Sequence, residues 1–236
     1  SPDNAAVADG TALLGTTNSP SFELSDQGLE LGSTYYWRVD ELNEATSPSI
    51  HTGDVWSFST PDYIVVDDFD QYDDICNRIF FAWEDGFGHN GAEDCDMPPS
   101  SGNGGASIVG YAQAPFAEKT IVNLDSEQSL PLSYDSSLGQ SEATLTLDGQ
   151  DWTTRGIRTL SLFFYGHSSR RSRQLYVKIN GTKVIYDGNF PSEQWQQWNI
   201  DLTTLDGLQN VTTLTIGVDG SSAKGTLYID DIRLYP

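Results

Sequence analysis

Alternation of apolar and polar positions runs through the chain from Tyr63 onward and is typical of half-buried β-strands. Turn residues (Gly, Ser, Asn and Asp) separate the alternating segments, and no pattern indicates a helix of three turns. Asn180-Gly181, between two such segments, is a strong signal for a tight β-hairpin. Many short strands without long helices predict a jelly roll or a related double sheet. The expected strands are 64–69, 79–83, 107–111, 121–123, 129–134, 142–147, 159–165, 174–179, 182–186, 196–201, 212–218 and 225–234.

The first 60 residues predict a smaller β unit. One or two helical turns are expected over 4–12 and a short strand over 21–24. A turn at Gly32 leads into a strand whose alternate residues Tyr35, Trp37 and Val39 should face a core, and 53–60 alternates again. Pro61-Asp62 marks the boundary. We therefore expect an all-β protein with two domains, residues 1–60 and residues 61–236.

Composition agrees with this fold class and restricts the partners. Aromatic residues make up 11% of the 236-residue chain, which has 22 glycines and one methionine. The 34 acidic residues outnumber the 12 basic ones, for a net charge of -22, so nucleic acid and anionic membranes are unfavourable partners. Solubility in a salty extracellular medium and cation binding both explain the acidic excess. No stretch is apolar for long enough to suggest insertion into a membrane.

Cys76 and Cys95 are the only cysteines. They flank a loop-rich acidic segment, and a disulfide between them would contribute roughly 3 kcal/mol on the loop-entropy model. Free thiols are the alternative, but the rest of the sequence is typical of an extracellular protein. The three histidines are scattered and no Cys-x-x-Cys occurs, so a zinc site is not expected.

The segment 64–74 is the most acidic strand end of the chain, and Asp230-Asp231 repeats the feature near the other end. Calcium binds six to eight hard oxygen ligands, which clustered aspartates and loop carbonyls provide. Strand alternation places Asp68 and Asp70 on one face and predicts that Asp230 and Asp231 diverge. One aspartate from each end can share an ion if the first and last strands of this domain are neighbours.

Residues 18–60 resemble fibronectin type III domains. Leu29, Gly32 and Tyr35 resemble the tyrosine corner of that fold, and the Trp-x-Phe-x-Thr motif that ends at Thr60 resembles its last strand. A complete domain of this kind has about 100 residues and seven strands, whereas the strands expected before Ser21 are mostly missing. The chain is cut within a domain, or another segment or chain completes the open sheet edge.

Residues 64–236 resemble the calcium-stabilised jelly-roll carbohydrate-binding modules of large secreted bacterial proteins. The acidic-aromatic opening Asp67-Asp68-Phe69-Asp70 and the closing segment 228–232 carry the resemblance. It implies a structural calcium ion held by Asp68 or Asp70 together with Asp230, with Asp67 and Asp231 as further candidates. The alternative is a solvated acidic edge that prevents strand pairing.

An aromatic, glycine-rich loop follows the acidic opening and is the candidate sugar site. Aromatic rings stack on the apolar faces of sugar rings, and polar side chains bind the hydroxyl groups. Most tryptophans of a β-sandwich belong to its core, and we expect this of Trp198. Ligand-binding candidates are Trp83, Asp85, His89, Asn90, Tyr111 and Trp195.

A basic region between Arg155 and Lys183 has seven basic residues and no acidic ones. Arginine suits carboxylate or sulfate groups, so Arg170, Arg171 and Arg173 are candidates for contacts with uronate-containing or sulfated glycans. Docking on the acidic first domain or on a neighbouring copy, and a solvated loop, are the alternatives.

The function expected from these features is non-catalytic binding of an extracellular polysaccharide or cell-surface glycan. We expect no enzyme, because a Gly-x-Ser-x-Gly elbow and phosphate-binding motifs are missing, and pairs such as Glu84-Asp85 occur in any acidic chain. The alternative is a self-assembling surface or fibre protein whose first domain is completed by a neighbouring chain. Asn180 and Asn210 match the glycosylation acceptor pattern, but Asn180 fits the hairpin turn better.

Overall fold

The computed structural model describes residues 1–236 except 25–26, 167–172, 189–192 and 221–222. The chain divides into two compact units, Ser1–Ile64 and Val65–Tyr235, with Pro236 grouped with the first. Each unit is described by itself.

The described residues of the first unit form the short helix α1 and two small antiparallel ribbons. Helix α1 (Asn4–Ala8) begins at Asp3, whose carboxylate accepts hydrogen bonds from two backbone N–H groups of the first turn. Strand β1 (Thr34–Trp37) pairs with β4 (Trp56–Ser59), and β2 (Glu41–Leu42) pairs with β3 (Ile50–His51). The helical turn expected over 4–12 is confirmed, whereas 21–24 forms no strand.

The core expected beneath β1 is largely missing. Tyr35 is half-buried and stacks on Phe58, with 5.7 Å between ring centroids. Trp37 is 46% exposed and Val39 is 68% exposed, so the prediction that these two side chains face a core is wrong. Each sheet that the structure describes in this unit has only two strands, and a two-stranded ribbon buries little apolar surface by itself. Tyr35 does accept a hydrogen bond from the upstream Glu30 backbone N–H at 2.8 Å, but the fibronectin type III resemblance stays a prediction.

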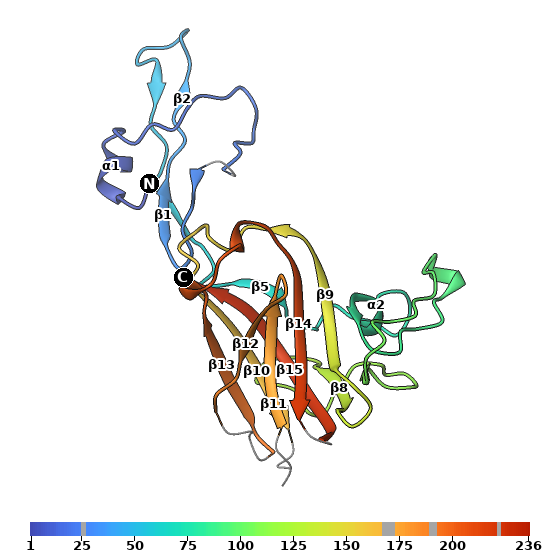
Figure 1. Ribbon diagram of the computed structural model, residues 1–236. Helices are drawn as coiled ribbons and strands as arrows, with labels where there is room; N and C mark the ends of the chain where they lie inside the picture. The colour runs from blue at the N-terminus through green and yellow to red at the C-terminus, as the bar shows by residue number, and fades with distance from the viewer. Residues whose placement is uncertain (25–26, 167–172, 189–192, 221–222) are drawn as a thin grey trace. The chain divides into compact units, whose positions relative to one another are not determined.

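The second unit is a β-sandwich of two antiparallel sheets (Figure 1). The strand order β13-β10-β15-β8 in one sheet and β12-β11-β14-β9 in the other is that of an eight-stranded jelly roll. Strand β7 extends the first sheet beside β8, β5 pairs with β15, and β6 extends the second sheet beside β9. The strands are β5 (Ile64–Asp67), β6 (Trp83–Glu84), β7 (Ser107–Val109), β8 (Leu130–Asp135), β9 (Ser141–Gln150), β10 (Thr159–Gly166), β11 (Arg173–Ile179), β12 (Thr182–Ile185), β13 (Trp195–Asp201), β14 (Val211–Gly220) and β15 (Lys224–Tyr235).

The core lies between the two sheets and follows the alternation of the sequence. Inward-facing aliphatic and aromatic side chains of β10, β11 and β14 are buried, each contributing about 1.5–3 kcal/mol relative to an exposed position. Trp198 is buried, as expected. The jelly roll and the all-β class are confirmed. The buried core residues of these three strands include Leu160, Leu162, Phe164, Leu175, Val177, Ile179, Leu214, Ile216 and Val218.

The Asn180-Gly181 hairpin is confirmed between β11 and β12. Both residues have positive φ, 48° and 83°, as a two-residue turn with the twist of a β-hairpin requires. The Asn180 side chain donates to the backbone oxygens of Gly207 and Asn210 at 3.2 and 2.9 Å, which joins the hairpin to the start of β14.

Helices in the second unit are single turns: α2 (Ile79–Ala82), η2 (Glu93–Cys95), η3 (Leu202–Thr204) and η4 (Leu208–Asn210). The strand expected over 79–83 is therefore wrong for all but its last residue, because a short apolar run fits a buried helical turn as well as a strand. Residues 121–123 also lie outside any strand. The predicted Cys76–Cys95 disulfide is present, with an S–S distance of 2.04 Å.

Candidate functional site

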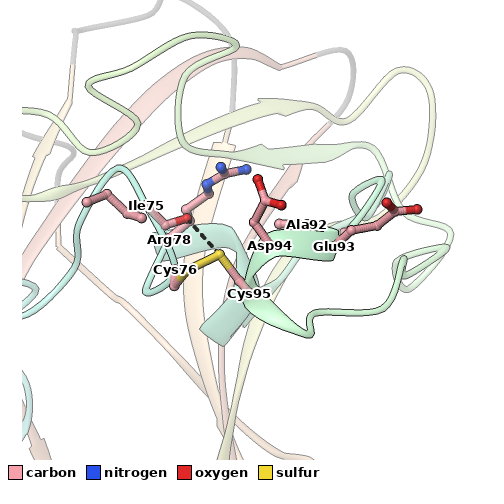
Figure 2. Close-up of a pocket in the computed structure, with 8 residues that line it drawn as sticks. Ile75, Cys76, Arg78, Ala92, Glu93, Asp94 and Cys95 are labelled. Carbon is pink, nitrogen blue, oxygen red and sulfur yellow. Dashed lines mark hydrogen bonds between the residues drawn. A yellow bond between two sulfur atoms is a disulfide. The ribbon is translucent and has the colours of Figure 1, made fainter.

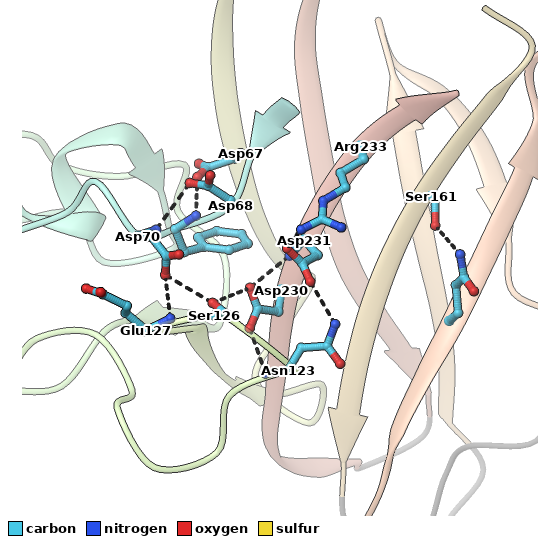
Figure 3. Close-up of polar contacts among 12 residues, drawn as sticks. Asp67, Asp68, Asp70, Asn123, Ser126, Glu127, Ser161, Asp230, Asp231 and Arg233 are labelled. Carbon is cyan, nitrogen blue, oxygen red and sulfur yellow. Dashed lines mark hydrogen bonds and ion pairs between the residues drawn. The ribbon is translucent and has the colours of Figure 1, made fainter. Parts of the chain in front are cut away.

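The acidic opening leaves the sheet earlier than expected. Strand β5 ends at Asp67, and Phe69 has a φ of 64°, so Asp68 and Asp70 belong to a turn rather than to one strand face. Asp70 Oδ1 accepts hydrogen bonds from the Ser126 hydroxyl at 3.0 Å and from the backbone N–H groups of Glu127 and Gln128 at 2.8 and 3.1 Å (Figure 3). The turn is thereby fastened to the loop at 126–128.

Asp230 and Asp231 both accept hydrogen bonds from Asn123, so the expectation that their side chains diverge is wrong. A register shift between β10 and β15, with a φ of 51° at Asp231, forms a β-bulge that interrupts the alternation. Asp230 Oδ2 accepts from the Asn123 backbone N–H at 2.9 Å, and Asp231 Oδ2 accepts from the Asn123 side-chain amide at 2.7 Å (Figure 3). Asp231 also forms an ion pair with Arg233.

The two acidic ends meet at Ser126, as the pairing of β5 with β15 allows. The Ser126 hydroxyl lies 3.0 Å from Asp70 Oδ1 and 3.2 Å from Asp230 Oδ1, and 2.9 Å from the Gln128 carbonyl oxygen. Burial raises the pKa of Asp230 to about 7, against the opposing effect of the Asn123 N–H bond. A cation bound nearby would stabilise the ionised form of this buried carboxyl group.

The oxygen donors at Ser126 match calcium in chemical type, since carboxylate, hydroxyl and carbonyl oxygens are all hard ligands. In number they fall short of a complete shell: no group of three or more His, Cys, Asp or Glu side chains among the described residues is arranged to hold a metal ion. Asp68 Oδ1 accepts from the Asp70 N–H at 3.3 Å. Asp67 accepts from Trp83 Nε1 at 2.8 Å, from the Tyr72 hydroxyl at 2.6 Å and from the Phe69 N–H at 2.8 Å, so its carboxylate already has three donors.

Trp83 and Asp85 are structural residues, which corrects their expected role in ligand binding. Trp83 is 0% exposed and packs against Phe69, with 5.8 Å between ring centroids, so no sugar can reach its ring. Asp85 is buried and accepts from three backbone N–H groups, those of Phe87, Gly88 and Val109 at 2.7–2.9 Å. Sequence alternation in β6 turns Trp83 inward and the next residue, Glu84, outward.

The aromatic loop nevertheless forms a pocket of about 350 Å³ at the β6 edge of the second sheet, hereafter the loop pocket. The His89 ring lies 4.7 Å from the Phe81 ring and 6.0 Å from the Phe80 ring, centroid to centroid. His89 Nδ1 accepts from the Gly91 N–H at 3.1 Å, so in the neutral ring Nε2 carries the proton and can donate. The polar wall consists of the Glu84 carboxylate, the hydroxyl groups of Ser100 and Thr146, and His89.

Phe80, Phe81, Ser100 and Thr146 were not among the expected ligand residues, although the first two lie in the expected loop. Asn90 is exposed next to His89 and does not line the loop pocket. The expected loop thus lines this pocket, whereas Trp83 does not.

Trp195 belongs to a separate aromatic group on the first sheet, and Tyr111 interacts through its hydroxyl group with Tyr228 of that group. Trp195 contacts Tyr165 and Tyr165 contacts Tyr228, with centroid distances of 5.7 and 5.9 Å across β13, β10 and β15. Tyr111 donates its hydroxyl proton to Glu118.

Where it is described, the basic region has both paired and exposed basic residues, and Arg155 and Arg158 are exposed. Arg170 and Arg171 lie outside the described residues, and Arg173 donates to the Tyr134 hydroxyl at 2.6 Å. Lys178 pairs with Glu142 and Lys183 pairs with Asp219. Contacts of this region with an anionic glycan stay a prediction.

No protein-family model matches the sequence, and no curated protein matches it. Similar solved structures include carbohydrate-binding modules. The family 11 module of the cellulosomal cellulase Lic26A-Cel5E of Clostridium thermocellum is 15% identical, with a TM-score of 0.45, over 73% of this chain and 94% of that one. The family 11 module from Clostridium thermocellum in complex with a β-1,3-1,4-mixed-linked tetrasaccharide is 18% identical, with a TM-score of 0.38, over 55% and 86%.

The CBM22-1-GH10 modules of xylanase 10B from Clostridium thermocellum, complexed with xylohexaose, are 13% identical, with a TM-score of 0.41, over 74% of this chain and 28% of that one. At these identities and TM-scores the likeness does not assign a function to this chain. Within the described residues, no helix has the length and apolar character needed to cross a membrane.

Proposed function

We propose that this protein binds an extracellular polysaccharide without cleaving it, and that the loop pocket holds one sugar residue. The observation that carries the proposal is the pocket itself. The Phe80 and Phe81 rings offer apolar surface for a sugar ring, and a carboxylate, an imidazole N–H and two hydroxyl groups can bind its hydroxyl groups.

Non-catalytic binding is favoured by the carboxylates present. Glycoside hydrolysis uses two carboxyl groups across the scissile bond. Glu84 is the one acidic residue among the described residues that line the loop pocket. Its neighbour Asp85 is buried and committed to three backbone N–H groups. The disulfide supports an extracellular or cell-surface location, where such bonds persist.

The test is isothermal titration with a panel of neutral oligosaccharides that includes xylohexaose and the mixed-linked tetrasaccharide, and with soluble polysaccharides. His89→Ala and Glu84→Gln should each weaken binding by about 10-fold, because each removes a hydrogen bond with a polar or charged partner. Phe87→Ala is the matched control, since Phe87 is 62% exposed in the same loop and does not line the pocket. Absence of binding to every member of the panel would refute the proposal.

We also propose a structural calcium ion bound by Asp70 and Asp230, with Ser126 and the Gln128 carbonyl group as nearby oxygen donors. Support comes from the meeting of the two carboxylates at one hydroxyl group and from the burial of Asp230. Calcium should raise the melting temperature by mass action, and a chelator should lower it. Asp230→Asn should abolish this response while Asp148→Asn, an exposed change on β9, retains it. If calcium does not change the melting temperature of the wild type, the calcium proposal is refuted, and Asp70 and Asp230 only join the two ends of the domain by hydrogen bonds through Ser126.

Self-association through the first unit is a second candidate function, and a separate observation supports it. Val7 is the one buried hydrophobic residue among the described residues of 1–60, whereas Trp37, Val39 and Trp56 are widely exposed. Apolar faces of this kind mark interaction sites. Light scattering across a concentration series should show dimers or larger species that Trp56→Lys disperses. A strict monomer at all concentrations would exclude this function.

A further inference from the structure

A second pocket, of about 450 Å³, lies at the disulfide and is separate in its lining from the loop pocket. Figure 2 shows the Cys76–Cys95 bridge and, extending from it to the same side, the Arg78 guanidinium and the Asp94 carboxylate. The lining side chains that matter chemically are Arg78, Glu93 and Asp94, with Ile75 and the disulfide as apolar wall.

Arg78 is positioned by aromatic rings. The Asp73 carboxylate is near it, and the pKa of Asp73 is lowered by the backbone N–H groups of Asn77 and Ile75 and, to a smaller extent, by the charge of Arg78. Its guanidinium lies over two aromatic rings, 5.4 Å from the centroid of Phe81 and 5.1 Å from that of Phe116. Among the described residues its side chain makes no hydrogen bond or ion pair, and its Nε is buried with no hydrogen-bond partner. Buried donors in proteins nearly always have partners, because an unpaired one carries a desolvation penalty. An arginine ordered by aromatic rings and left with free donors is therefore suited to an external acceptor.

The charges around Arg78 determine which kind of hydrogen-bond acceptor can bind to it. Glu93 and Asp94 line the same pocket, in a chain of net charge -22, so an anionic group on Arg78 would be repelled by two carboxylates. A sugar hydroxyl group both donates and accepts. Two neighbouring hydroxyl groups can accept from Arg78 and donate to Glu93 or Asp94 at the same time, which a uronate or sulfate group cannot do.

We propose that the disulfide pocket is a second sugar subsite, in which Arg78, Glu93 and Asp94 bind the neighbouring hydroxyl groups of an uncharged sugar residue. The inference rests on the proposed polysaccharide binding and extends it, since it adds a subsite and assigns the glycan to the neutral class. Phe81 connects the two subsites: its ring lines the loop pocket and also lies under the guanidinium of Arg78.

The experiment is titration of the folded wild type and variants with the best neutral oligosaccharide of the panel and with an oligogalacturonate of equal length. Arg78→Gln should weaken binding of the neutral ligand by about 10-fold to 100-fold, and Arg78→Lys by at least about 10-fold, because lysine lacks the planar fork. Asp94→Asn should also weaken it. Arg158→Gln, a change at an exposed arginine ahead of β10, is the matched control and should bind as the wild type does.

The outcomes separate this inference from the proposed function. If His89→Ala weakens binding while all Arg78 and Asp94 variants bind as the wild type does, the second subsite is refuted and polysaccharide binding stands. If the oligogalacturonate binds more tightly than the neutral ligand and Arg78→Gln removes that preference, the neutral assignment is overturned. Should Arg78→Gln fail to fold, Asp94→Asn and the comparison of the two ligands in the wild type still decide the question.

Discussion

Replacement of Trp83 distinguishes a core tryptophan from a sugar platform. The indole is 0% exposed, packs on Phe69 and donates from Nε1 to Asp67 Oδ2 at 2.8 Å. Trp83→Phe keeps most of the ring but removes the bond to a carboxylate, which is worth about 1.5–3 kcal/mol. Trp83→Ala also leaves a cavity and should cost about 3–5 kcal/mol in the free energy of unfolding.

The assay is urea denaturation at fixed calcium concentration, followed by far-UV circular dichroism so that loss of the tryptophan does not change the signal. Trp56→Ala is the matched control, because Trp56 is 60% exposed, and its cost should stay within about 0.5 kcal/mol. Glycan affinity is measured on whatever fraction of each variant is folded.

The result that refutes this reasoning is specific. If Trp83→Ala leaves the free energy of unfolding within about 0.5 kcal/mol of the wild type but abolishes binding of every glycan that the wild type binds, then Trp83 is a ligand platform and its burial is not a property of the protein in solution.

Three further changes test other parts of the sandwich. Gly217→Ala should cost about 1–3 kcal/mol in thermal or urea unfolding, because a Cβ there would lie 2.3 Å from the Tyr176 ring, whereas Gly15→Ala meets only ordinary contacts and serves as its control. Burial raises the pKa of Glu118, but bonds from Tyr111 and two backbone N–H groups outweigh it and lower the pKa below the ordinary 4.5. Glu118 therefore stabilises the fold above pH 4.5 and loses this contribution as the pH falls through its folded pKa, so Glu118→Gln should flatten the acid limb of a stability-pH curve; an unchanged limb contradicts this. Cys76→Ser with Cys95→Ser should cost roughly 3 kcal/mol, and an unchanged urea midpoint would show that the bridge constrains nothing.

Strand positions were predictable wherever one face of a strand is buried, because alternation then encodes the structure directly. This holds for β8 to β15, which the sequence places with errors of one to a few residues at their ends. Prediction failed where the chain is apolar without a period, as in α2. It also failed at Asp231, since a β-bulge depends on the register of the neighbouring strand and not on the local sequence.

The candidate site was predictable as a segment but not as a set of contacts. The aromatic and glycine residues of the loop predict the segment that lines the loop pocket, and His89 is one of the expected residues that line it. Residue type alone predicts a ligand-binding role for Trp83, whereas alternation over Trp83-Glu84 in β6 predicts that Trp83 faces inward, as the structure shows. Arg78 has no local signal, because its setting depends on Phe116, which lies far away in the sequence and is brought close only by the fold.

Trp83 also explains how the acidic turn and the loop pocket are related. Its indole N–H holds Asp67 at the end of β5, while its backbone pairs with Leu145 in β9 and so fixes the next residue, Glu84, at the pocket wall. Asp67 therefore anchors β6, and the turn that begins there carries Asp70 to Ser126. The buried Trp83 side chain thus holds the acidic turn at the end of β5, and its backbone positions the wall of the loop pocket. Because both roles require burial, Trp83 lies beneath the loop pocket and does not line it.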